Sequence, residues 1–79
     1  MPLLEARFHP QKKSGDGVVV VGRVRCEGRS AHVEPEREGE MLEKLLYLVR
    51  ESEPEPFERL RTLRSDFWSF VEIDEGGRL

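Results

Sequence analysis

The stretch GVVVVGRVRCEGRSAHVEPE, residues 17–36, decides the fold, because its residues alternate as they do in a β-hairpin. Successive side chains of a strand point to opposite faces, and Val24 and Cys26 alternate here with Arg23 and Arg25. Glu27 and Gly28 suit the turn, since glycine accepts the positive φ angle of a tight hairpin. We therefore predict a hairpin with three cross-strand pairs: Cys26 with Arg29, Val24 with Ala31, and Gly22 with Val33.

This hairpin is predicted to have two chemically different faces. The face expected to turn toward the core carries Val18, Val20, Val24, Ala31 and Val33. The outward face is expected to carry Val19, Val21, Arg23, Arg25 and His32, with His32 opposite Arg23. A face that contacts only water does not need two valines beside its arginines. The pattern therefore favours an outward face that contacts a partner.

The remaining sequence predicts one strand before the hairpin and two helices after it. Residues 3–9 alternate as a strand that Pro10 ends. Residues 37–51 form the clearest helix, with an apolar stripe at helical spacing, and a second helix covers residues 56–64 after a proline-rich break. The stripe consists of Leu42, Leu45, Leu46 and Val49, widened by Met41 and Leu48.

The segment 67–73 fits either a strand or a helix capped by Ser65. Aromatic and β-branched residues dominate it, which favours the strand. As a strand it has apolar residues on both faces, Trp68 and Phe70 on one and Phe67, Val71 and Ile73 on the other. A strand of this kind is expected inside a sheet that is covered on both faces. The helices of one subunit can cover only one of these faces, so the other face is expected to need a partner.

The predicted class is α+β: a three-stranded antiparallel meander followed by two helices and a C-terminal strand, in the order βββααβ. The helices are expected on one face of the sheet, over Leu4, Phe8, Val20 and Val24. Residues 1–79 are predicted to form a single small domain, with residues 75–79 as a frayed tail.

Composition narrows the functional classes. A chain of 79 residues has a marginal core, and its one cysteine cannot form an internal disulfide, so pairing between subunits is a natural source of added stability. No apolar run approaches the length of a membrane span, which predicts a cytoplasmic protein without membrane contact. Ten arginines, sixteen acidic residues, no asparagine and one glutamine resemble a thermophile's composition.

Charge is divided unevenly along the chain. Residues 1–33 contain six basic and three acidic residues, whereas residues 34–79 contain seven basic and thirteen acidic residues. The two halves therefore carry net charges of +3 and −6, and they can attract each other within or between subunits.

The sequence provides weak grounds for catalysis or for a cofactor. Cys26 and His32 are predicted on opposite faces of the sheet, so Cys26 is expected to be a core residue and not a nucleophile. His9, His32 and Glu34 could hold a transition metal, but two histidines on separate strands are a weak signal. The glycines lack the spacing of a phosphate-binding loop. We expect no catalytic, cofactor-binding or metal site and no small-molecule ligand.

The preferred hypothesis is a small non-enzymatic interaction or regulatory module that acts as a homodimer. Its predicted partner-binding residues are Val19, Val21, Arg23, Arg25, His32, Trp68 and Phe70. The alternative hypothesis is a nucleic-acid-binding module, with phosphate contacts from Lys12, Lys13, Arg23, Arg25 and Arg29. No aromatic residue lies between the hairpin arginines, which favours the homodimer over the nucleic-acid binder.

Overall fold

The computed structural model describes residues 2–73, and these confirm the predicted α+β class and the order βββααβ. The predicted tail, residues 75–79, lies outside the described residues. The elements are β1 (Leu3–Phe8), β2 (Val19–Glu27), β3 (Ser30–Pro35), α1 (Glu40–Ser52), α2 (Pro56–Arg61) and β4 (Trp68–Ile73). The first helix begins three residues later than predicted, after Gly39 with a φ of 113°. The second ends three residues earlier than predicted.

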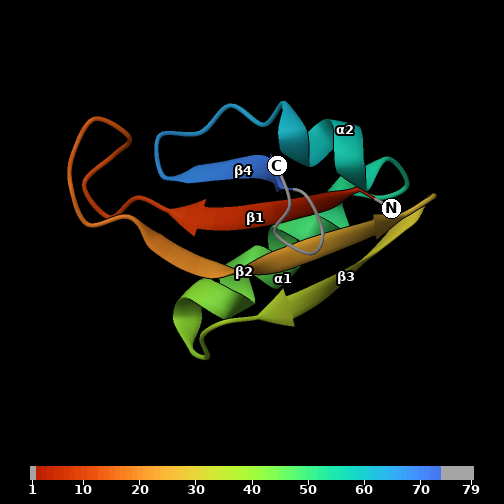
Figure 1. Ribbon diagram of the computed structural model, residues 1–79, viewed down its shortest axis with the longest axis horizontal. Helices are drawn as coiled ribbons and strands as arrows, with labels where there is room; N and C mark the ends of the chain where they lie inside the picture. Colours follow the sequence, from red (N-terminus) through yellow and green to blue (C-terminus); the bar gives the residue numbers. More distant parts are fainter. Residues whose placement is uncertain (1, 74–79) are drawn as a thin grey trace.

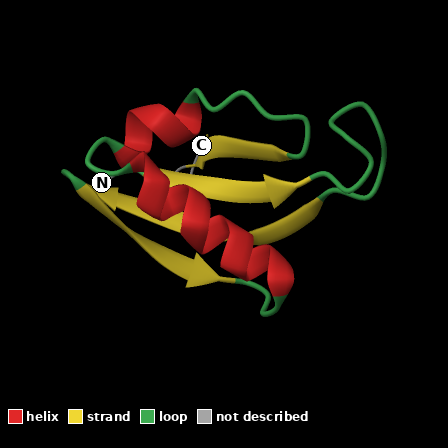
Figure 2. Cartoon of the chain, turned by 180° about the vertical axis from the view of Figure 1, so that it is seen from behind, coloured by secondary structure: helices red, strands yellow, loops and turns green. Residues whose placement is uncertain are grey.

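The four strands form one sheet in the order β3-β2-β1-β4, and all neighbours are antiparallel. Both helices of the described chain lie on the same face of this sheet, and α1 crosses it diagonally (Figures 1 and 2). We call this the inner face and the opposite side the outer face. The strand β4 is an edge strand, so the prediction that it lies in the interior of the sheet was wrong.

The hairpin of β2 and β3 is present, but its register differs from the prediction by two residues. Cys26 pairs with Ala31, Val24 with Val33, and Arg25 with His32. The turn residues are Gly28 and Arg29, and Gly28 has the positive φ of 63° that a tight turn requires. A shift of two residues keeps each side chain on its face, so Val24, Cys26, Ala31 and Val33 still turn inward.

A β-bulge in β2 reverses the predicted faces of the valines before it. Ala6 pairs with Gly22 but Arg7 pairs with Val20, so Val21 is an extra residue without a partner in β1. One inserted residue exchanges the two faces for the part of the strand beyond it. Val21 is therefore completely buried and Val19 packs against the core. The inward placement of Val18 and Val20 was wrong: Val20 pairs with outward Arg7, and Val18 is 49% exposed.

The core lies between the inner face of the sheet and the two helices. Leu45 and Val49 of α1 and Leu60 of α2 are buried against the sheet. The sheet contributes Leu4, Ala6, Val21, Val24, Cys26, Trp68 and Phe70. These residues hold α1 in place across β2 and β3, which leaves its opposite side in solvent.

Most of the segment 67–73, Trp68–Ile73, is a strand, as favoured, but its faces are the reverse of the expected ones. Trp68 pairs with Phe8 and Phe70 with Ala6, so both aromatic rings turn inward. Each is 7% exposed. The hydroxyl of Ser65 accepts hydrogen bonds from the backbone N–H groups of Phe67 and Trp68, at 3.1 and 3.2 Å, and so begins a strand instead of capping a helix.

Candidate interaction surface

The structure divides the seven predicted partner-binding residues between the core and the surface. Val19, Val21, Trp68 and Phe70 belong to the inner side, so their predicted outward placement was wrong. The bulge causes this reversal in β2, and the pairing of β4 with β1 causes it in β4. Arg23, Arg25 and His32 do lie on the outer face. The predicted surface therefore keeps its charges but loses its apolar part.

The outer face has acidic groups among its cations. Arg7 pairs with Glu5 at 2.7 Å, Arg25 pairs with Glu34 at 3.1 Å, and His32 lies 3.7 Å from the carboxylate of Glu27. Antiparallel sheets commonly have one solvated face of this kind. Arg23 is exposed and lies between Glu5 and Glu34 in the sheet. These carboxylates reduce the attraction of the face for a polyanion.

The five predicted phosphate contacts do not gather in one patch. Lys12 and Lys13 lie in the loop before β2, whereas Arg29 lies in the turn after it, so β2 separates them along its length (Figure 1). Arg23 and Arg25 lie between these ends, next to the carboxylates of the outer face. A duplex or single strand needs a continuous basic track, which this arrangement does not supply.

Cys26 and the histidines lie apart from one another. The thiol of Cys26 is buried on the inner side, and burial raises its pKa, which disfavours the reactive thiolate. His32 is on the outer face, across the sheet from that thiol. His9 is buried beside β4, where its Nε2 lies 2.8 Å from the hydroxyl of Ser69. Within residues 2–73, no three His, Cys, Asp or Glu side chains cluster as metal ligands would.

The outward side of the first helix exposes two apolar residues among its charged ones. Leu46 is 42% exposed and Tyr47 is 59% exposed, and they are neighbours in α1. The buried residues of the same helix, Leu45 and Val49, point toward the sheet. A surface helix normally turns charged or polar residues to solvent, so the exposed leucine beside the exposed tyrosine is the candidate for a contact surface.

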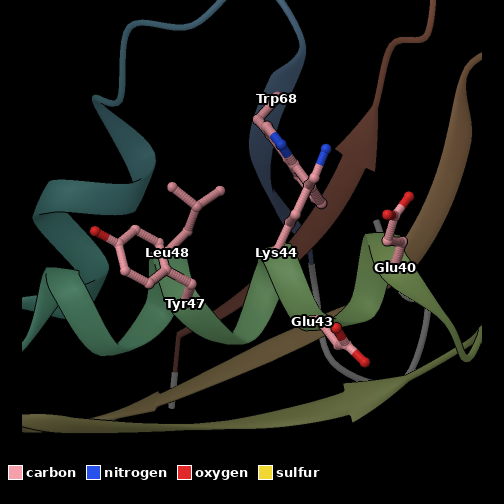
Figure 3. A pocket seen from close by; sticks show the side chains of 6 residues that line it. All are labelled: Glu40, Glu43, Lys44, Tyr47, Leu48 and Trp68. Atoms are coloured by element: carbon pink, nitrogen blue, oxygen red, sulfur yellow. The ribbon is translucent and has the colours of Figure 1, made fainter.

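Grooves flank this outward side. One, of about 470 Å³, is lined by Glu40, Glu43, Lys44, Tyr47, Leu48 and Trp68. Lys44 extends from α1 toward Trp68 of β4, while Glu43 projects on another side of the helix (Figure 3). The other hollow, of about 320 Å³, lies between α1 and β3 and is lined by Ala31, His32, Val33, Leu46, Val49, Arg50 and Glu53. The ridge of α1 between these hollows carries Tyr47.

Leu46 was predicted to belong to the apolar stripe of the helix, and Tyr47 was not among the predicted site residues. The available signal was the width of that stripe. The apolar residues extend around more of the helix than one contact with a sheet can cover. They are Leu42, Leu45, Leu46, Tyr47, Leu48 and Val49. The excess apolar residues had to be exposed. Only the packing of α1 on β2 and β3 shows which ones they are.

Comparison with protein-family models, with curated proteins and with solved structures gave no match. Neither helix among the described residues has both the length and the apolar character that a membrane crossing requires. Large apolar side chains that are exposed in the described part of the chain are Val18, Leu46, Tyr47, Phe67 and Val71, and of these only Leu46 and Tyr47 are adjacent in sequence.

Proposed function

We propose that the protein is a small non-enzymatic interaction module that acts as a homodimer in the cytoplasm. One observation carries the proposal: Leu46 and Tyr47 are exposed side by side on α1, between two hollows. Tyrosine and the other aromatic residues are enriched where proteins contact each other. A second subunit covering this side would also supplement the small core of a 79-residue chain.

The first prediction concerns the oligomeric state and the face that forms the contact. Light scattering from the wild-type chain should show a mass that rises with concentration from 9.2 kDa toward twice that value. Tyr47→Lys should increase the dissociation constant of the dimer at least about 10-fold, because hot-spot tyrosines commonly contribute 2 kcal/mol or more. The matched change Val71→Lys, on the outer face, should leave the dissociation constant unchanged.

This experiment tests separately whether the chain forms a homodimer and which face of the chain makes the contact. A wild-type chain that stays at 9.2 kDa at all concentrations contradicts the homodimer. A dimer that is lost in Val71→Lys and kept in Tyr47→Lys supports the homodimer but moves the contact to the outer face of the sheet.

The nucleic-acid alternative has less support, and a titration tests it. At physiological salt we expect a labelled oligonucleotide to bind more weakly than about 100 μM, the weak limit of ordinary non-specific binding. The physical reason is the separation of the cations and the carboxylates among them. Tight binding that weakens with salt, and that is lost when Arg23 and Arg25 are both changed to Glu, would reverse the ranking of the two functions.

A further inference from the structure

Four exposed residues of α1 form a self-complementary stripe. Glu43, Leu46, Tyr47 and Arg50 are all exposed, and their spacing of three, four and seven residues places them on neighbouring turns of one side. The acidic residue is at the end nearer the helix N-terminus, the basic residue is at the other end, and the apolar pair lies between them. We call these four residues the α1 stripe.

A two-fold axis brings each surface onto a copy of itself in reverse order. If the axis passes midway between Leu46 and Tyr47, residue 43 of one helix lies opposite residue 50 of the other. The same axis places residue 46 opposite residue 47. Glu43 then meets the Arg50 of the second copy, and Leu46 meets its Tyr47. The ion pair and the apolar contact each occur twice in the dimer.

We infer that two copies of this chain associate through antiparallel α1 helices. This inference rests on the homodimer proposed above. Glu43 of each copy pairs with Arg50 of the other, and Tyr47 of each copy packs on Leu46 of the other. That leucine lines the hollow between α1 and β3, so an incoming tyrosine ring also meets Val33 at its wall. The neighbouring hollow beside Trp68 receives the flank of the second helix.

The charges of α1 disfavour one of the two neighbouring registers. Moving the axis by half a residue, onto Tyr47, places Glu43 opposite Glu51 and Lys44 opposite Arg50, which are like-charge pairs. Like charges across an interface disfavour the wrong arrangement. Contact through one helix and its flanks is small, below about 1,200 Å² in total, so the dimer is expected to be weak, with a dissociation constant in the micromolar range or above.

Charge reversal at Glu43 and Arg50 tests the register. Glu43→Arg and Arg50→Glu should each raise the dissociation constant at least about 10-fold, since each change creates two like-charge contacts per dimer. The double variant, Glu43→Arg with Arg50→Glu, should recover the wild-type value within about threefold. An equimolar mixture of the two single variants should form a heterodimer, because all its pairs are again of opposite charge.

Controls and contrary results follow from the same set of variants. Asp16→Arg and Arg23→Glu make matched charge changes away from α1 and should leave the dissociation constant unchanged. All four positions are exposed, so far-UV circular dichroism should show folded protein throughout. A wild-type dimer unaffected by either single change would overturn the α1 pairing and leave the homodimer standing. The α1 pairing would also be overturned if the single changes weakened the dimer but neither the double variant nor the mixture recovered the wild-type dissociation constant. A wild-type monomer would overturn the homodimer itself.

Discussion

Val21→Asp should remove most or all of the chain's stability, whereas Val20→Asp should leave the chain stably folded. The Val21 side chain is completely buried, in contact with the core between the sheet and α1. An unpaired carboxylate there costs on the order of 4 kcal/mol or more. A chain of this length is expected to have a free energy of unfolding of about 4–12 kcal/mol. The substitution therefore removes a large part of the stability, and at the lower end of that range all of it.

The matched change at Val20 has a different environment. Val20 lies across from Arg7 on the outer face, so a carboxylate there remains near solvent and beside a cation. We expect a change of less than about 1 kcal/mol, as for other surface substitutions. Urea denaturation followed by circular dichroism measures both variants. Equal stabilities, or the opposite order, would contradict the bulge, because a regular strand would turn Val20 inward and Val21 outward.

This pair of residues also shows how far the sequence could predict the fold. Alternation of Val24 and Cys26 with Arg23 and Arg25 was sufficient to predict the hairpin and its faces on one side of Gly22. In the run Val18–Val21 every residue is identical, so nothing in the sequence indicates which valine is the extra one. The bulge becomes evident only from the pairing with β1, where Ala6 and Arg7 oppose Gly22 and Val20.

Gly22 explains part of this local geometry. A Cβ atom added there would lie 2.7 Å from the backbone oxygen of Glu34, so β3 approaches β2 more closely than a side chain allows. Beside the bulge, the glycine thus allows the edge strand β3 to approach β2. A sequence pattern can indicate a close approach at a glycine in a strand, but it cannot identify the neighbour that approaches.

Two other differences have the same physical origin in long-range pairing. The faces of β4 were reversed because both are apolar in sequence, and only the pairing of Trp68 with Phe8 determines which one meets the helices. The exposed apolar pair of α1 was missed for a related reason. Helical spacing alone grouped Leu46 with Leu45, and the position of the sheet decides which of the two is buried.

The second large expected effect concerns the adjacent leucines Leu45 and Leu46. Substitution of Leu45 should lower the stability of the fold, whereas substitution of Leu46 should weaken the dimer. Leu45 is completely buried between α1 and the sheet. Leu45→Ala should lower the free energy of unfolding by about 3 kcal/mol, through lost burial and the cavity left behind. Leu46 is 42% exposed, so Leu46→Ala should cost less than about 1 kcal/mol in a dilute, monomeric sample.

The dimer should respond in the reverse order. Leu46→Ala removes the side chain on which Tyr47 of the second copy packs, and the two-fold axis repeats the loss, so the dissociation constant should rise about 10-fold or more. Leu45→Ala should leave the dissociation constant of the folded fraction near the wild-type value. Urea denaturation at low protein concentration and light scattering at high concentration separate the two effects. If Leu46→Ala lowered stability as much as Leu45→Ala and left association unchanged, Leu46 would be a core residue and the α1 stripe would lose its apolar centre.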